Sequence, residues 1–169
     1  EVGTRDGFQA EKEQISVADK VAVIDALIDA GLRSVEATSF VSPRALPQLA
    51  DAADVMAQVQ RKPGVKLAVL VPNARGAERA AAAKADVMVG FISASESHCK
   101  TNLNKTIDEA IADFAQVVPI ANQWGLKMHG GMATAFGCPF EGDVPISNIL
   151  KIVGAYHAHG IRRIGFGDT

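Results

Sequence analysis

Short apolar runs alternate with longer segments of helical period along the chain, and this alternation constrains the fold more than any other feature of the sequence. The short runs are typical of strands, and the longer segments are typical of helices. No hairpin signal joins two neighbouring runs. We therefore predict a parallel sheet with right-handed crossovers. The expected strands cover residues 1–5, 34–40, 65–71, 86–93, 126–133 and 161–168.

Five helices are expected between these strands. The first has a clear beginning and a clear end: Ser16 is a reasonable N-cap, Asp19 places a carboxylate in the first turn, and Gly31 is a stop signal. The expected helices cover residues 17–31, 46–60, 74–84, 106–125 and 146–160.

Two architectures are compatible with the alternating order of strands and helices: a doubly wound open sheet and an eight-stranded barrel. No G-x-G-x-x-G follows the first strand, which disfavours the dinucleotide-binding form of the open sheet. Polar residues at the carboxyl ends of the strands favour a barrel, because barrel enzymes keep their chemistry there. A (β/α)8 TIM barrel needs about 250 residues. We therefore expect residues 1–169 to be the N-terminal part of one TIM-barrel catalytic domain, cut at both ends, with the final units absent.

Composition narrows the class of protein. The 169 residues are 48% hydrophobic and 21% charged, which is ordinary for a globular domain. A net charge of -2 gives no electrostatic reason to expect nucleic acid as a partner. No apolar run approaches the roughly 20 residues of a membrane span. Two cysteines are too few for a disulfide framework, so a reducing compartment is expected.

Four motifs carry a resemblance to a known family: EVGTRDGFQAEK, VEATSFVSP, GCPFEG and GDT, in this order along the chain. Together they resemble the 3-hydroxy-3-methylglutaryl-CoA lyase family of metal-dependent lyase and Claisen-condensing barrels. The resemblance implies cleavage of a 3-hydroxyacyl-CoA, either 3-hydroxy-3-methylglutaryl-CoA or a close analogue, to acetyl-CoA and a keto acid such as acetoacetate. Such a reaction needs a divalent cation, a base and positive charge at the developing enolate.

The resemblance also implies roles for residues near the start of the chain. Asp6 is similar to the metal-binding aspartate of the family, a hard oxygen ligand suited to Mg²⁺ or Mn²⁺. Arg5 is similar to the arginine that stabilises the enolate oxygen. Glu36 is similar to a site glutamate that holds Arg5 in place, and Gln9 is expected to position the same loop.

Further site residues are expected at other strand ends. Asp168 is similar to a site aspartate near the metal and the substrate, and Ser39 and Thr169 are candidates for hydrogen bonds to the substrate. The remaining metal ligands of the family, a His-x-His pair and an asparagine, are expected beyond Thr169. The sequence departs from the lyase pattern at Gly165, His129 and Gly131, where the family has serine, arginine and tyrosine. These departures leave the acyl group open, with a citramalyl-CoA-like or a bulkier 3-hydroxyacyl-CoA as an alternative substrate.

Several other residues are interpreted structurally. His157 and His159 are expected at a helix end, Cys138 as a packed thiol, and His98 with Cys99 on a loop. Two alternative functions stay open: a Claisen-condensing enzyme of the isopropylmalate or homocitrate synthase kind, and a non-catalytic partial barrel. The expected location is the bacterial cytoplasm or the mitochondrial matrix. A homo-oligomer is expected for the full-length protein, with acyl-CoA as its substrate and no nucleic acid or membrane partner.

Overall fold

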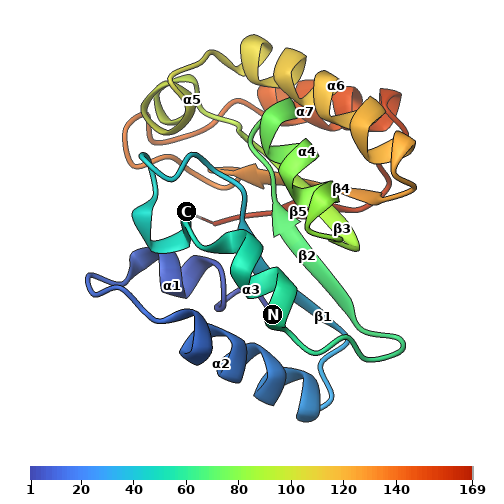
Figure 1. Ribbon diagram of the computed structural model, residues 1–169. Helices are drawn as coiled ribbons and strands as arrows, with labels where there is room; N and C mark the ends of the chain where they lie inside the picture. The colour runs from blue at the N-terminus through green and yellow to red at the C-terminus, as the bar shows by residue number, and fades with distance from the viewer. Residues whose placement is uncertain (169) are drawn as a thin grey trace.

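The computed structural model describes residues 1–168 and shows a five-stranded sheet (Figure 1). Every neighbouring pair of strands is parallel, and the strands lie side by side in their sequence order. This confirms the predicted parallel α/β sheet. The strands are β1 (Ser34–Ser39), β2 (Lys66–Leu70), β3 (Val87–Ser93), β4 (Lys127–Ala133) and β5 (Ile164–Phe166).

Helices fill the connections and cover one face of the sheet. In Figure 1, α2 and α3 lie along β1, while α6 lies along β3 and β4. Their apolar sides form two buried clusters, one under α2, α3 and α4 and the other under α5, α6 and α7. The helices are α1 (Asp6–Ala10), α2 (Val17–Asp29), the 3-10 helix η1 (Pro47–Leu49), α3 (Ala52–Gln58), α4 (Ala74–Ala82), α5 (Glu96–Leu103), α6 (Ile107–Gln123) and α7 (Ile146–Ala158).

Capping residues set where the long helices begin. The Ser16 hydroxyl accepts a hydrogen bond from the Asp19 amide at 3.1 Å, as the sequence predicts. Thr106 and Glu109 form a capping box at the start of α6, so two otherwise unpaired amides are satisfied. Gly31 follows the end of α2 with φ +99°, a conformation that favours glycine, which agrees with its predicted role as a stop.

Two glycines on the helix side of the sheet make room for aromatic rings. A Cβ on Gly90 would lie 2.4 Å from the Phe114 ring, and one on Gly130 would lie 2.7 Å from the Tyr156 ring. These rings pack edge to face at 4.6 Å. The Tyr156 hydroxyl donates a hydrogen bond to the Gly131 carbonyl at 2.7 Å, and burial raises the pKa of Tyr156. Helices α6 and α7 are thereby held close to the sheet.

The strand predicted over residues 1–5 is wrong. Glu1 alone pairs with β1, where its carbonyl accepts from the Glu36 amide at 2.8 Å. The Val2 carbonyl then accepts from the amides of both Arg5 and Asp6, so the chain turns into α1 instead of continuing as a strand.

Two other segments also differ from the prediction. The helix expected over 46–60 is divided into η1 and α3, and the Gln48 carbonyl at the break accepts from the buried Lys20 amine at 2.5 Å. The loop expected around His98 and Cys99 is helix α5, which buries a single residue, Cys99, and therefore has little helical pattern in its sequence.

Candidate active site

Arg5 lies at the centre of a polar group beside β1. Its Nε donates to Glu36 Oε1 at 2.6 Å. Its Nη1 donates to Asp6 Oδ1 at 2.8 Å and to Gln9 Oε1 at 3.4 Å. The structure therefore brings together four of the residues singled out in the sequence, and Arg5 is the one that contacts all the others. We call these four residues the Arg5 group.

Two hydrogen bonds fasten this opening segment to β1. The Thr4 hydroxyl, which is buried, donates to the Glu36 carbonyl at 2.9 Å. The Glu36 amide donates to the Glu1 carbonyl, as described above. The turn then places Arg5 at the N-cap of α1 and Asp6 in its first turn, where a carboxylate is favoured by the helix dipole. Gln9 follows one turn later on the same side as Arg5.

The side chains of the Arg5 group differ in exposure, and this difference indicates which of them can contact a ligand. The side chains of Arg5 and Glu36 are 14% and 10% exposed, whereas Asp6 is 66% exposed. A nearly buried carboxylate needs a partner, and Glu36 has one in Arg5. Asp6 keeps its second oxygen, Oδ2, without a partner among residues 1–168. Glu36 is thus placed to hold Arg5, and Asp6 is placed to contact something outside the chain.

Ser39 and Thr38, at the carboxyl end of β1, are both buried. The Ser39 hydroxyl accepts from the Val41 amide at 3.3 Å and donates to the Leu70 carbonyl at 3.5 Å, so its bonds tie the strand end to its neighbours. The Thr38 hydroxyl has no hydrogen-bond partner among the described residues. These bonds occupy Ser39 within the protein, while its role toward substrate stays a prediction.

Asp168 lies two residues beyond β5 and is exposed. Since β5 is parallel to β1, Asp168 and the end of β1 lie at the same edge of the sheet. The Gly167 amide, next to it, donates to the Met132 carbonyl at 2.7 Å and fixes the tail of β5 against β4. Thr169 lies outside the described residues.

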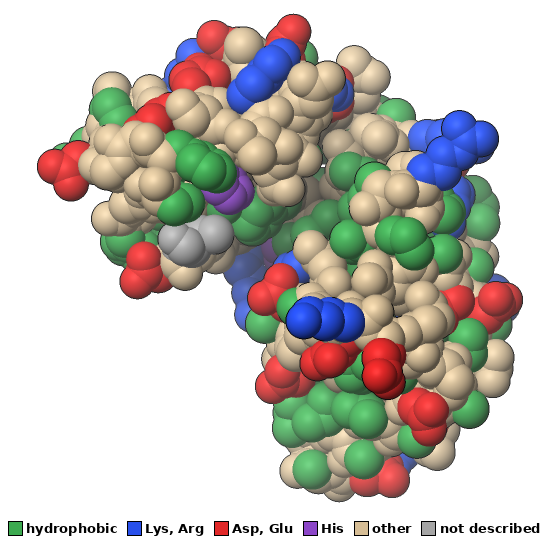
Figure 2. Space-filling view, turned by 90° about the vertical axis from the view of Figure 1, so that its left-hand side faces the viewer, with side chains coloured by type: hydrophobic (Ala, Val, Ile, Leu, Met, Phe, Trp, Pro, Cys, Tyr) green, Lys and Arg blue, Asp and Glu red, His purple; other side chains and the backbone are tan. Residues whose placement is uncertain are grey.

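Figure 2 shows that the molecule is hollowed between two lobes on the side where α1 and α5 lie in Figure 1.

A second polar cluster, which the sequence did not reveal, joins the ends of β3 and β4. Ser93 Oγ and His98 Nδ1 are 2.6 Å apart, and Cys138 Sγ donates to Ser95 Oγ at 2.9 Å. Burial acts to raise the pKa of Cys138, but hydrogen bonding with Ser95 and with the backbone at Phe140 and Glu141 outweighs it and lowers that pKa. The thiol is 6% exposed, which agrees with the expected packed cysteine. The feature of the sequence that could have indicated this cluster is Ser95, which is the N-cap of α5.

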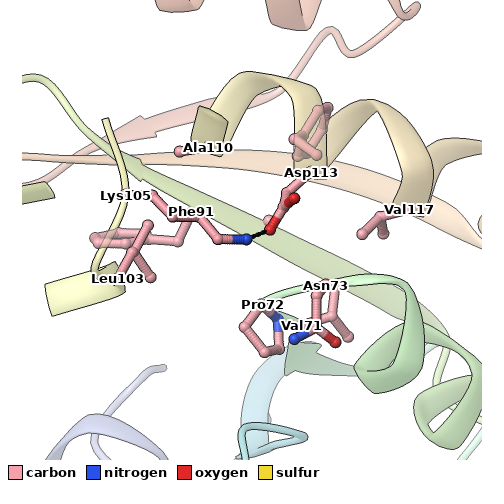
Figure 3. A pocket seen from close by; sticks show the side chains of 11 residues that line it. Val71, Pro72, Asn73, Phe91, Leu103, Lys105, Ala110, Asp113 and Val117 are labelled. Atoms are coloured by element: carbon pink, nitrogen blue, oxygen red, sulfur yellow. Dashed lines mark ion pairs between the residues drawn. The ribbon is translucent and has the colours of Figure 1, made fainter. Parts of the chain in front are cut away.

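A small cavity of about 120 Å³ lies on the helix side of the sheet (Figure 3). Lys105 and Asp113 point toward one another across it and form an ion pair, and Phe114 and Val117 of α6 line its apolar wall. It contains none of the residues of the Arg5 group. We therefore place the candidate site in the Arg5 group and not in this cavity.

The metal site is incomplete within the part of the chain that the structure describes. Residues 1–168 contain no cluster of three or more His, Cys, Asp or Glu side chains arranged to hold a metal ion. His157 and His159 lie in the last turn of α7 and at its C-cap, as predicted, and the His159 ring packs near Phe114. Asp6, exposed and with a free oxygen, is suited to be one ligand among several.

Comparison with known proteins decides the family. The sequence profile of the HMGL-like family matches residues 1–169, the entire chain. The chain belongs to the HMGL-like family. This confirms the resemblance found in the sequence.

Members of the HMGL-like family with established names are similar over the full chain. The mitochondrial hydroxymethylglutaryl-CoA lyase of Bos taurus is 40% identical over 169 residues, which are 52% of its own length. The Bacillus subtilis hydroxymethylglutaryl-CoA lyase is 41% identical, over 56% of its length. The chain thus spans about half the length of the curated relatives it matches. These relatives are named as enzymes, and a further relative, the cytoplasmic 3-hydroxy-3-methylglutaryl-CoA lyase of Danio rerio, is 41% identical over 50% of its length.

Solved structures of HMG-CoA lyases share the fold. The Bacillus subtilis enzyme superposes with a TM-score of 0.97 at 41% identity, covering 100% of this chain and 57% of that one. The Acinetobacter baumannii enzyme, in complex with coenzyme A and 3-methylmalate, gives 0.96 at 36% identity, covering 100% and 55%. The predicted fold class, a partial TIM barrel, is confirmed. Among residues 1–168, no helix is long and apolar enough to cross a membrane.

Proposed function

We propose that the protein acts as a metal-dependent carbon–carbon lyase. It cleaves 3-hydroxy-3-methylglutaryl-CoA, or a close analogue, to acetyl-CoA and a keto acid, which is acetoacetate for the methyl compound. Two observations support this: relatives that carry the lyase name over the whole chain, and a similar structure that binds coenzyme A. Acyl-CoA is therefore the proposed substrate class.

The reaction places charge at two points. A base removes the proton from the hydroxyl on carbon 3, and that oxygen becomes the carbonyl of the keto acid as the bond between carbons 2 and 3 breaks. The electron pair of the broken bond moves to the thioester, which leaves as the enolate of acetyl-CoA and takes up one proton. Stabilising the enolate oxygen lowers the barrier of the cleavage step.

The Arg5–Glu36 pair is the observation that carries this proposal. Nε and Nη1 of Arg5 are occupied by Glu36, Asp6 and Gln9, while Nη2 has no partner among residues 1–168. A guanidinium fixed on one side and free on the other offers rigid donors to an oxyanion without a cost of reorganisation. We assign Arg5 to the enolate oxygen and Glu36 to the orientation of Arg5.

Asp6 is assigned as a ligand of the divalent cation, Mg²⁺ or Mn²⁺, with Asp168 close to the metal and the substrate. A bound cation of this kind polarises the substrate oxygens and favours the ionised hydroxyl. Asp6 fits that role in charge, exposure and ligand type. Gln9, Ser39 and Thr169 are assigned to the positioning of the loop and substrate. The remaining ligands do not come from a cluster within the described residues.

The test is a product assay on the protein expressed from its natural gene. Incubation with 3-hydroxy-3-methylglutaryl-CoA and Mg²⁺ or Mn²⁺ is expected to release equal amounts of acetyl-CoA and acetoacetate, and a chelator is expected to stop the release. Condensation of acetyl-CoA with a keto acid, with no cleavage, would replace this proposal with a synthase. Absence of both reactions would favour the non-catalytic alternative.

A further inference from the structure

A hollow of about 600 Å³ lies where the end of β1 meets the first turns of α4. Three arginines line it: Arg44 from the loop after β1, and Arg75 and Arg79 from α4. Its remaining walls come from uncharged residues, which are Phe40, Ser42, Pro43, Asn73 and Gly76. We call this hollow the arginine pocket. Its volume is in the range of about 300–1,000 Å³ that is typical of small-molecule sites.

The arginine pocket is built by the close packing of α4 on the end of β1. The Phe40 amide donates to the Leu70 carbonyl at 2.9 Å, so the end of β1 is fixed to β2. A Cβ on Gly76 would lie only 2.9 Å from the Phe40 carbonyl oxygen, so glycine lets the first turn of α4 lie against the strand end. Helix α4 also packs on α6, and α3 packs on α2 and β1. Both walls of the pocket are therefore supported by described elements.

Arg79 is held in a fixed position at the floor of the pocket. Its guanidinium carbon lies 5.3 Å from the centre of the Phe40 ring, within the range of a cation–π interaction. Its Nη1 donates to the Val41 carbonyl at 3.4 Å. The other donors of this guanidinium have no partner among residues 1–168. Arg79 therefore keeps donors for a ligand, and the Phe40 ring fixes their position.

The positive charge of the pocket is not neutralised by the described residues. Arg44 and Arg75 are exposed, and none of the three arginines forms an ion pair within residues 1–168. Glu78, on the same helix, is exposed and likewise has no ion pair there. Asn73 caps α4, and the first turn of this helix has no acidic residue, so the positive end of its dipole adds to the field. The pocket therefore suits an anion with several charges.

We propose that the arginine pocket binds the phosphate groups of a ligand. A guanidinium donates paired hydrogen bonds to phosphate oxygens, and each phosphate monoester carries about 1.5 to 2 negative charges. Two sources supply such groups: the coenzyme A end of the substrate, and a free phosphate compound. The first source rests on the proposed function, and the pocket suits it because Phe40 directly follows the candidate site residue Ser39.

Calorimetry on the protein expressed from its natural gene tests the pocket, with coenzyme A and inorganic diphosphate as the probes. In the double variant Arg75→Gln/Arg79→Gln, the affinity for a bound probe should fall about tenfold or more, because hydrogen bonds to charged groups are lost. Arg33→Gln, at an exposed arginine directly before β1 and therefore at the opposite end of that strand, is the matched control and should keep the affinity.

A second double variant keeps the test valid if the change at Arg79 impairs folding. Arg44→Gln/Arg75→Gln alters only exposed side chains that form no ion pair within residues 1–168. It should weaken probe binding about tenfold or more for the same reason.

Kinetics distinguishes the two sources of phosphate. The 3-hydroxy-3-methylglutaryl group is presented on coenzyme A and on pantetheine, which has no phosphate. If coenzyme A is the source, the double variants should raise KM for the coenzyme A thioester about tenfold or more, with kcat and the kinetics of the pantetheine thioester unchanged, because binding remote from the reacting atoms is lost. If a free compound is the source, diphosphate binding should fall while both thioesters keep their KM values. Either result supports the pocket.

The failure of this inference is distinct from the failure of the proposed function. If neither thioester is cleaved, the lyase assignment fails, and calorimetry with the two probes still tests the pocket. Three results would overturn the inference: binding of neither probe to the unmodified protein, an unchanged affinity in both double variants, or an equal fall in Arg33→Gln.

Discussion

Removal of the Glu36 side chain tests the Arg5 group by its energetics. In Glu36→Ala, Arg5 loses its 2.6 Å partner, and the Arg5 side chain is only 14% exposed in the unmodified protein. Surface pairs contribute about 0–1 kcal/mol, whereas breaking a buried pair costs about 3–5 kcal/mol. The 10% exposure of Glu36 puts this pair close to the buried case. We predict a loss of about 3 kcal/mol in the free energy of unfolding.

Glu36→Gln should cost less, because the amide oxygen still accepts from Arg5 Nε. A hydrogen bond to a charged group contributes about 1.5–3 kcal/mol and a neutral one about 0.5–1.5 kcal/mol, so the expected loss is about 1–1.5 kcal/mol. Urea denaturation followed by circular dichroism measures both variants. Glu78→Ala, at an exposed carboxylate of α4, is the control and should stay within about 0.5 kcal/mol. A change below about 1 kcal/mol in Glu36→Ala would show that the pair does not anchor Arg5.

Three further predictions address the proposed chemistry, the packing and the single tyrosine. Arg5→Lys should lower kcat by about 100- to 1000-fold with a much smaller change in KM, because one ammonium cannot hold Glu36 and also offer a fixed pair of donors. Steady-state kinetics measure both constants, and a near-normal kcat would contradict the assigned role of Arg5. Gly130→Ala should lower the free energy of unfolding by about 1–3 kcal/mol, because the new Cβ would meet the buried Tyr156 ring at 2.7 Å. Gly154→Ala in α7 is the control and should cause no such loss, because a Cβ there meets nothing within 4 Å. Thermal unfolding compares the two variants, and equal Tm values would be inconsistent with the packing of Tyr156 on Gly130. Because burial raises the pKa of Tyr156, the folded state keeps the phenol proton to higher pH than the unfolded state does. The contribution of Tyr156 to stability should therefore be full below about pH 10, the pKa of an unfolded tyrosine, and should fall above that pH. Absorbance at 295 nm in an alkaline titration reports the single tyrosine of the chain, and its ionisation near pH 10 in the folded protein would refute the prediction.

The central strands of the sheet were predictable from the sequence because buried parallel strands are nearly continuous apolar runs. The runs at 65–71 and 86–93 contain β2 and β3 within one residue at each end. Helix α6 was equally clear, since its apolar residues follow a helical period and Thr106 caps it. Strands that are apolar along their whole length and helices with one apolar face can therefore be found without a structure.

The opening segment and α5 were not predictable in this way. The turn at Val2 depends on hydrogen bonds from Arg5 and Asp6, which local pattern does not indicate. Helix α5 turns almost all of its side chains away from the core, so the apolar period that identifies a helix is missing. Sequence resemblance singled out Arg5 and Glu36 correctly as neighbours, but their separate exposures require the packed fold.

The Phe91 ring lies over Gly131, where a Cβ would come within 2.5 Å of it. This position was equally out of reach, because it follows from the pairing register of β3 with β4. The sequence shows a glycine at 131 and an aromatic residue at 91, forty positions apart. Only the register places the two on the same face and at the same level.

Each strand of this sheet pairs with the strands that precede and follow it in the chain, and this order has a consequence for biosynthesis. Neighbouring pairs close short loops, so they form early and do not wait for distant partners. During translation, Arg5 and Glu36 are both synthesised by the time β1 is complete, whereas Asp168 is synthesised after the five described strands. The two residues of the charged pair that we assign to the enolate are therefore synthesised before the second strand of the described sheet, and Asp168 follows its fifth.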